Sequence, residues 1–175
     1  MQKNEFRKIC KSRLKSHAAR AARCEHYALL WRLERLIKFL KARKILIFLP
    51  MSYEPNVLIL RKKLSKSCEF YVPFMVDISL KMVRLRQPFK ISRFGLRQTL
   101  PQNGYFKKVD LAVVPAIGVD GAMARIGHGK GFYDMFFSGL KLKPAIAFVS
   151  IKDCFCSEIL SFDHDVKGDF YITPS

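Results

Sequence analysis

The N-terminal part of the chain carries apolar residues at helical spacing, separated by basic ones. From Gln2 to about His17 this pattern predicts an amphipathic helix, whose apolar face is Phe6, Ile9, Cys10 and Leu14. A second helix is predicted to follow, with a stripe made of Tyr27, Leu30, Leu33, Ile37 and Leu40. The same helical spacing places Trp31, the single tryptophan, in the core.

Further along, the apolar residues form short runs, four of which are followed by a proline. These runs predict strands at 45–49, 69–72, 81–85, 111–114, 145–149 and 170–173. Helices are predicted from Pro55, with Val57, Leu60 and Leu64 inward, and over 132–140, whereas 86–108 has the composition of an irregular connection. We therefore expect an α/β fold: one domain over 1–175 with an open, mainly parallel, Rossmann-like sheet and helices on both faces. Ligands of such sheets bind at the carboxyl ends of the strands, where the loop after Val114 lies.

The composition supports a compact domain and argues against membrane and secretory classes. The chain has 175 residues, of which 50% are hydrophobic, so disorder is not expected. No stretch approaches the roughly 20 apolar residues of a membrane span, and residues 1–23 lack the apolar region of a secretory signal. That basic, amphipathic segment leaves a mitochondrial presequence open, although Glu5 and the lack of a serine-rich stretch count against it. Five scattered cysteines suit reduced thiols, so we expect a cytoplasmic protein.

The net charge of +18 attracts phosphates of any kind. Lys and Arg are spread from Lys3 to Lys167, without a basic tail or an RNP-like motif, so a generally basic surface is the preferred interpretation and a nucleic-acid partner is not expected. Cys154-x-Cys156 with His164 lacks the spacing of a known zinc knuckle, which favours ordinary free cysteines over a metal site.

The segment that suggests chemistry is 125–134, which reads R-I-G-H-G-K-G-F-Y-D before a predicted helix. Glycines at 127, 129 and 131 remove Cβ atoms, so backbone N–H groups can approach a phosphate, and the helix N-terminus adds positive potential. Arg125 and Lys130 add full charges, and Asp134 can hold Mg²⁺ beside the same phosphates. The loop is not a Walker A motif, since Gly131 follows the lysine, nor a dinucleotide fingerprint, since residue 132 is Phe. A plain turn between strand and helix is the alternative.

This loop, after Val114-Pro115, resembles the R-L-G-x-G-x-G-Y-Y-D motif of the 5-formyltetrahydrofolate cyclo-ligase family. The resemblance continues at four further places in the same order: Lys3-x-x-x-Arg7, residues 49–54, residues 71–73, and His164-Asp165 with Asp169 and Thr173. The departures from the family pattern are Phe132 for Tyr, Met123 for Gly, and Gly95-Leu96-Arg97-Gln98-Thr99 where the family has G-I-x-E-P.

The resemblance implies closure of 5-formyltetrahydrofolate, with or without a polyglutamate tail, to 5,10-methenyltetrahydrofolate at the expense of ATP with Mg²⁺. It implies ATP contacts from Lys3, Arg7, Arg125, Ile126, Gly127, His128, Gly129, Lys130, Gly131, Phe132 and Tyr133, with Arg125 and Lys130 catalytic. The implied folate contacts are Leu49, Glu54, His128 and Phe132, and the implied Mg²⁺ ligands are Asp134 and Asp165.

Each assignment has a plainer structural alternative. Lys3 and Arg7 could be a solvated helix face, Asp165 a loop-capping acid, Glu54 a cap for the helix at Pro55, and Phe132 a core residue. Another ATP-dependent ligase or small-molecule kinase is the alternative enzyme, and a basic nucleic-acid-binding module the alternative outside enzymes.

Overall fold

The computed structural model describes residues 1–175 except 21–22, 77–78, 93–94, 96, 103 and 107; the side chains of residues 20, 23 and 24 are not described either. In chain order the elements are α1 (Lys3–Arg20), α2 (Arg23–Phe39), β1 (Lys44–Leu46), α3 (Leu58–Leu64), β2 (Glu69–Val76), β3 (Ser79–Arg84), β4 (Phe89–Ile91), β5 (Arg97–Thr99), β6 (Leu111–Pro115), β7 (Gly118–Val119), β8 (Arg125–Ile126), α4 (Phe132–Ser138), β9 (Ala145–Val149) and β10 (Phe170–Ile172).

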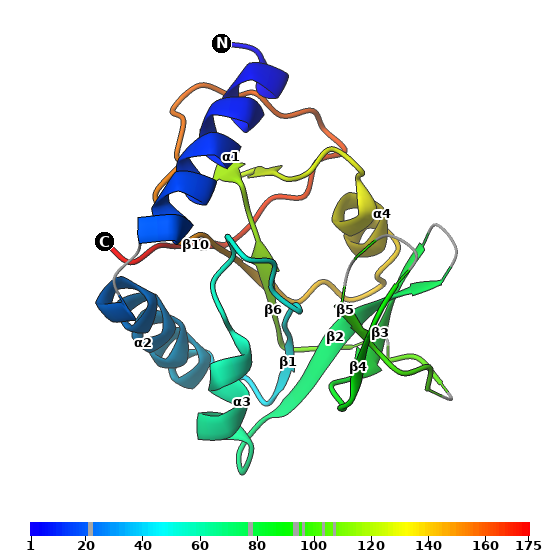
Figure 1. Cartoon of the computed structure of the whole chain (residues 1–175). Coiled ribbons are helices and arrows are strands. Elements are labelled where there is room, and N and C mark those ends of the chain that lie inside the picture. The colour runs from blue at the N-terminus through cyan, green and yellow to red at the C-terminus, as the bar shows by residue number, and fades with distance from the viewer. Residues whose placement is uncertain (21–22, 77–78, 93–94, 96, 103, 107) are drawn as a thin grey trace.

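The main sheet has six strands in the order β10-β9-β6-β1-β2-β3, all parallel except the β2–β3 pair. Successive residues of each central strand face opposite sides: Leu111 and Val113 pack under α2 and α3, whereas Ala112 and Val114 pack under α4. Figure 1 shows α2 and α3 on one side of the sheet and α4 on the other. The predicted open, mainly parallel sheet with helices on both faces is confirmed.

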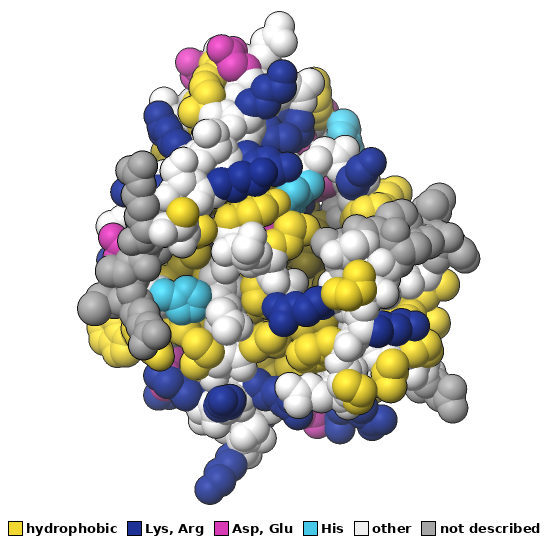
Figure 2. Space-filling model, viewed as in Figure 1, with side chains coloured by type: hydrophobic (Ala, Val, Ile, Leu, Met, Phe, Trp, Pro, Cys, Tyr) yellow, Lys and Arg dark blue, Asp and Glu magenta, His cyan; other side chains and the backbone are white. Residues whose placement is uncertain are grey.

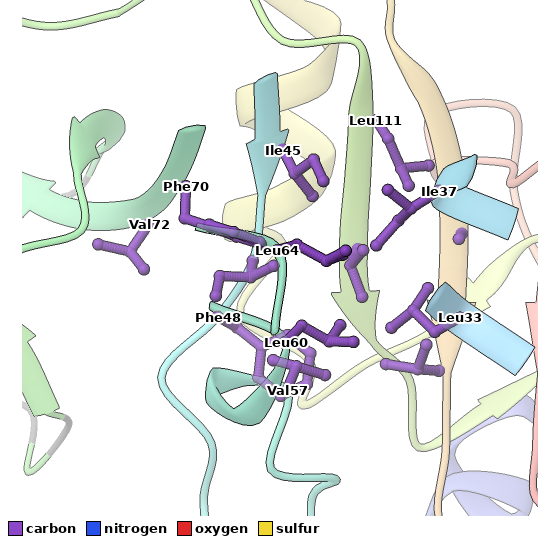
Figure 3. Close-up of a cluster of buried hydrophobic side chains, with 14 of the residues drawn as sticks. Leu33, Ile37, Ile45, Phe48, Val57, Leu60, Leu64, Phe70, Val72 and Leu111 are labelled. Atoms are coloured by element: carbon purple, nitrogen blue, oxygen red, sulfur yellow. The ribbon is translucent and has the colours of Figure 1, made fainter. Parts of the chain in front are cut away.

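Aliphatic side chains from α2, α3 and the strands fill the larger core. Figure 3 shows Ile37 of α2 beside Leu111, Leu64 of α3 near Phe70, and Leu60 of α3 near Phe48 and Val57. The inward orientation predicted for Val57, Leu60 and Leu64 is confirmed, since all three are buried. α3 begins at Leu58 rather than at Pro55.

α1 does not cover the main sheet but packs on the small β7–β8 hairpin. Its face of Phe6, Cys10 and Leu14 is buried against Ile117, Ile126, Ile151 and Cys154. Ile9, which was predicted on that face, is 39% exposed. Because β8 leads directly into the glycine-rich loop, this packing places the first turns of α1 beside that loop (Figure 1).

The predicted positions of Tyr27 and Trp31 in the core are wrong, since these side chains are 54% and 56% exposed. The buried face of α2 is formed by Leu29, Leu30, Leu33 and Ile37. At about 100° per residue, Trp31 lies about 200° from Leu33 around the helix and so points to solvent. There the Arg35 guanidinium lies 4.7 Å from the centre of the indole ring.

Strand limits also differ from prediction. The strand predicted over 45–49 is shorter, because only Lys44–Leu46 pair with β2, although the apolar residues after it stay buried. β2 continues through Pro73 to Val76, since β1 pairs only with Glu69–Tyr71 and Pro73 has no paired strand on that side among the described residues. The region 86–108, predicted irregular, contains the β4–β5 hairpin, and Arg125 and Ile126, predicted in the loop, form β8.

Candidate active site

A cleft of about 1110 Å³ lies between the start of α1, the glycine-rich loop, α4 and the segment 159–167. Eight of the predicted site residues line it: Lys3, Arg7, Arg125, Gly127, Gly129, Gly131, Asp134 and Asp165. In Figure 2 Lys and Arg side chains lie across the α1 region, above a hollow in this face that has hydrophobic walls. The fold thus brings together residues from both ends and the middle of the chain.

Arg125 is a buried cation beneath the loop. Its side chain is only 7% exposed, its Nε donates to Pro115 O at 2.8 Å, and its Cζ lies 4.8 Å from the Tyr133 ring centre. Burial lowers the pKa of Arg125, and the nearby groups Tyr133, Asp134 and Glu54 oppose that shift. An arginine side chain nevertheless stays protonated in proteins. Arg125 therefore places a fixed positive charge against the loop.

Gly127 is glycine because the Arg125 side chain occupies the space of a Cβ. A Cβ built at Gly127 would lie 2.3 Å from Arg125 Nη1. Gly129 and Gly131 have φ angles of +88° and +66°, a region that side chains disfavour. The three glycines are therefore required for two different reasons: one for close contact with a cation, two for backbone conformation.

Arg7 joins α1 to this loop. Its Nε donates to Gly127 O at 2.7 Å, and its Nη1 donates to Asn4 Oδ1. The solvated-face alternative is wrong for Arg7, because its side chain is half-buried and bonded to the loop. Arg7 also lines the cleft, so its charge faces the same volume as Arg125.

Lys3 and Asp165, assigned to ATP and Mg²⁺, contact each other. Lys3 Nζ lies 2.5 Å from Asp165 Oδ2, and the two side chains are 17% and 8% exposed. The same carboxylate oxygen accepts the N–H of Phe162 at 2.7 Å, which is the loop-capping arrangement considered from the sequence. Asp165 thus holds the 159–167 segment to α1 as well as lining the cleft.

The second acid, Asp134, sits in the first turn of α4 and accepts the N–H of Val166 through Oδ1 at 2.9 Å. Among the hydrogen bonds of the described residues, Asp134 Oδ2 and Asp165 Oδ1 accept none. In the described part of the chain no three His, Cys, Asp or Glu side chains converge as a metal site. Two carboxylates beside a cleft lined by basic residues still fit Mg²⁺, which can take its other ligands from phosphates and water.

The remaining residues of the predicted nucleotide set lie outside the cleft lining. Lys130 is exposed, and none of the ion pairs and hydrogen bonds among the described residues involves its ammonium group. Ile126 is buried in the core with α1, and Phe132 is half-buried at the start of α4. Tyr133 packs against the core under α4, where burial raises its pKa.

Two of the four predicted folate residues, Leu49 and Glu54, lie in residues 49–54 after β1, a segment that we call the Glu54 wall and that lies outside the cleft lining. Glu54 Oε2 accepts the N–H of Met51 at 2.9 Å. It does not cap α3, whose N-cap residue is Val57, so the capping alternative is wrong. Burial raises the pKa of Glu54, while the Met51 N–H and the charge of Arg125 oppose the shift. Leu49 is half-buried against the larger core.

His128 connects the glycine-rich loop to the Glu54 wall. Its Nε2 is 2.6 Å from the Tyr53 hydroxyl, and the ring is half-buried. Burial, helped by the charges of Arg125, Lys11 and Arg7, lowers the pKa of His128 to about 4. The imidazole is therefore uncharged at neutral pH and cannot serve as a phosphate-binding cation there.

This lowered pKa predicts how stability depends on pH. In the unfolded chain a histidine titrates near 6.5, so between pH 6.5 and 4 the unfolded state binds more protons than the folded one. The free energy of unfolding should therefore fall as the pH drops through that window, by about 1–2 kcal/mol after allowance for partial exposure of the ring. Urea titrations at pH 7.0 and 4.5 measure the difference. The difference in the free energy of unfolding between the two pH values should be smaller in His128→Gln and unchanged in His164→Gln, whose side chain is exposed. An unchanged difference in His128→Gln would contradict the assignment of the lowered pKa to His128.

Sequence reasoning missed two residues that shape the site, Tyr53 and Asp120. Tyr53 was named only as part of a motif, yet it contacts His128. Asp120 is fully buried and accepts four backbone N–H groups, those of Ala122, Ala124, Leu160 and Ser161. Burial alone would raise the pKa of Asp120, but these donors and the Ser161 hydroxyl outweigh it and the pKa is lowered. In the sequence, only its place directly before Gly121, a pair typical of turns, could have drawn attention to Asp120.

The segment that departs from the family pattern, residues 95–99, includes β5 (Arg97–Thr99), which pairs with β4 and contacts β2. Gln98 and Thr99 are buried there, and Arg97 donates to Pro50 O at 3.0 Å, next to the Met51–Glu54 segment. Leu96 lies outside the described residues.

An open parallel sheet with a basic, glycine-lined cleft defines an α/β protein suited to an anionic ligand. The 5-formyltetrahydrofolate cyclo-ligase family matches residues 1–174. The chain therefore belongs to the 5-formyltetrahydrofolate cyclo-ligase family, a family of ligases.

Two curated relatives share this name. The 5-formyltetrahydrofolate cyclo-ligase of Mycolicibacterium smegmatis is 33% identical over 86 residues, covering 47% of this chain and 44% of that protein. The enzyme of the same name from Mus musculus is 32% identical over 65 residues, covering 35% and 32%. The matched segments thus span less than half of either relative.

Solved structures show the same fold. The Aquifex aeolicus 5,10-methenyltetrahydrofolate synthetase superposes with a TM-score of 0.83 at 21% identity, covering 100% of this chain and 91% of that one. The Mycoplasma pneumoniae 5,10-methenyltetrahydrofolate synthetase gives 0.74 at 17% identity, with 98% of both chains covered. In the part of this chain that the structure describes, no helix is long and apolar enough to cross a membrane.

Proposed function

We propose that this chain converts 5-formyltetrahydrofolate to 5,10-methenyltetrahydrofolate with Mg²⁺ and ATP, releasing ADP and phosphate. The observation that carries the proposal is the buried Arg125 guanidinium, lodged where Gly127 has no side chain and facing a cleft of about 1110 Å³. Membership of the cyclo-ligase family supports the substrate class. The names of the two relatives support the same reaction.

ATP would supply the phosphoryl group that makes the formyl oxygen a leaving group, after which N10 closes the ring. Such a transfer mainly needs positioning and charge neutralisation. Arg125 provides a buried cation, and Arg7 lines the same cleft from α1. Lys130 stands on the exposed side of the loop, where its flexible side chain can reach a terminal phosphate. Asp134 and Asp165 would hold Mg²⁺ through their remaining carboxylate oxygens.

The substrate would lie on the Glu54 wall. A pterin presents N–H donors, and Glu54 has a half-buried carboxylate that can accept them, with Leu49 and Phe132 offering apolar contacts. His128, uncharged at neutral pH, would touch substrate as a neutral donor or acceptor. The surplus of basic residues suits the anionic tail of a polyglutamylated folate. We further propose that residues 1–175 act as one domain in the cytoplasm.

An absorbance assay tests the proposal. The protein with 5-formyltetrahydrofolate, ATP and Mg²⁺ should gain the near-ultraviolet absorbance of the conjugated methenyl product. The gain should vanish without ATP or with excess chelator. No gain in the complete mixture would overturn the proposal. ATP turnover with another acceptor would then favour a different kinase or ligase, and tight, salt-dependent RNA binding would favour a nucleic-acid-binding module.

The metal-binding role proposed for Asp134 predicts how the reaction rate depends on the Mg²⁺ concentration. Asp134→Asn keeps the oxygen that accepts the Val166 N–H but removes a negative charge. We expect the Mg²⁺ concentration for half-maximal rate to rise about 10- to 100-fold. Titrating Mg²⁺ at saturating ATP measures it. Asp153→Asn, at an exposed position outside the cleft, should leave the titration unchanged. An identical titration in Asp134→Asn would remove that residue from the ligand set.

A further inference from the structure

The Tyr53 hydroxyl and His128 Nε2, 75 residues apart in sequence and 2.6 Å apart in space, join the Glu54 wall to the glycine-rich loop. Their rings lie 6.0 Å apart between centres and are inclined by 40°. At this distance the contact is a short, strong hydrogen bond. It is the side-chain contact through which the two proposed ligand walls meet.

The composition of the loop makes this contact important. Between Gly127 and Gly131 the only side chains are those of His128 and Lys130, and Lys130 is exposed. Two of the three glycines have positive φ angles, so the backbone itself is permissive. Arg7 fixes the beginning of the loop by its bond to Gly127 O. The next side chain along, His128, is the one that can fix the loop to the opposite wall.

Tyr53 is held firmly enough to act as an anchor. Its ring packs against the core cluster that includes α1, and it lies between Met51 and Glu54, which are hydrogen-bonded to each other. The hydroxyl also approaches Met51 Sδ at 3.3 Å, but a thioether is a weak acceptor. We therefore take the imidazole nitrogen as its main partner.

Charge does not explain the placement of His128. An imidazole whose pKa is lowered by burial and by neighbouring cations is neutral at working pH, so it adds nothing to phosphate attraction. Position 128 is also a variable place in the family's loop motif, so the motif itself does not require histidine there. What distinguishes this residue is its geometry.

We propose that Tyr53 and His128 are positioning residues, whose hydrogen bond sets the distance between the phosphate-holding loop and the Glu54 segment that faces the folate. This inference rests on the proposed function, because the reacting atoms it aligns are the terminal phosphate and the formyl oxygen. A displacement of about 1 Å in such an alignment can cost about 100-fold in rate. The pair therefore acts on the chemical step more than on binding.

A double-mutant cycle tests the inference. Tyr53→Phe removes the hydroxyl and keeps the ring, and His128→Leu removes the acceptor. Each should lower kcat about 10- to 100-fold with KM for ATP and folate within about twofold. The double variant should be no slower than the slower single variant, because both remove one bond. His128→Gln, which restores an acceptor, should recover much of the rate. Tyr27→Phe, an exposed hydroxyl on α2, is the matched control.

A second measurement does not depend on catalysis. In Tyr53→Phe the ¹⁵N order parameters of residues 127–131 should fall from about 0.85 toward 0.6, with those of β6 and β9 unchanged. Unchanged loop order, additive effects in the cycle, or losses confined to KM would each overturn the inference. If wild-type protein forms no methenyl product while Tyr53→Phe loosens the loop, the proposed reaction fails but the contact's positioning of the loop stands.

Discussion

Lys130→Ala should lower kcat/KM for ATP by about 100- to 1000-fold, the usual loss when one charge-stabilising donor is removed from a phosphoryl-transfer site. The lysine is exposed and makes no ion pair or hydrogen bond with the residues that the structure describes, so its removal should leave the free energy of unfolding within about 0.5 kcal/mol. Initial rates at varied ATP, with a urea titration of each protein, separate the two effects.

Lys141→Ala is the matched control for this loss, since Lys141 is also exposed but lies after α4 and outside the cleft lining. It removes the same net charge. If both variants lose the same modest activity, the general field of the protein explains the effect. Normal kinetics in Lys130→Ala would remove the residue from the catalytic set.

Gly127→Ala is expected to lower kcat/KM by about 100-fold or more through Arg125. The new Cβ would lie 2.3 Å from Arg125 Nη1, so the guanidinium has to move from its place beside Pro115 O. The clash is with the end of a flexible side chain, so we expect a loss of only about 1–2 kcal/mol in the free energy of unfolding. Steady-state rates and urea titration measure both quantities.

Gly139→Ala provides the comparison, because a Cβ there meets its nearest neighbours at 3.6 and 3.7 Å, ordinary contact distances. It should behave as wild type in both measurements. If Gly127→Ala retained full activity, the position of the buried cation would not matter for the reaction. Unfolding of Gly127→Ala at room temperature would instead assign the glycine a purely structural role.

The spacing of apolar residues along the chain predicted most of the fold. Runs such as 111–114 and 145–149 predicted β6 and β9 almost to the residue, because central parallel strands are buried on both faces and contain mainly apolar residues. The prediction for Trp31 was wrong because it also relied on counting apolar residues. A large aromatic residue two positions from Leu33 counts as apolar, yet it faces solvent. The short β4–β5 and β7–β8 hairpins have two or three residues per strand, too few to establish a period.

For the site, the sequence predicted which residues lie close together but not which pairs of them contact each other. The glycine spacing and its flanking charges indicated the loop, and the structure places Arg125, Arg7 and Asp134 around one cleft. That Lys3 meets Asp165, or Tyr53 meets His128, depends on segments brought together by tertiary folding. Such long-range pairs have no local pattern in a single sequence.

The Lys3–Asp165 contact joins residues 162 positions apart, so the order of synthesis matters for how the cleft is completed. Lys3 leaves the ribosome 162 residues ahead of Asp165. The apolar face of α1 finds its partners Ile117, Ile126, Ile151 and Cys154 only after those later residues have been synthesised. A nascent chain would therefore carry α1 without its native partners until residues 117–154 have been synthesised.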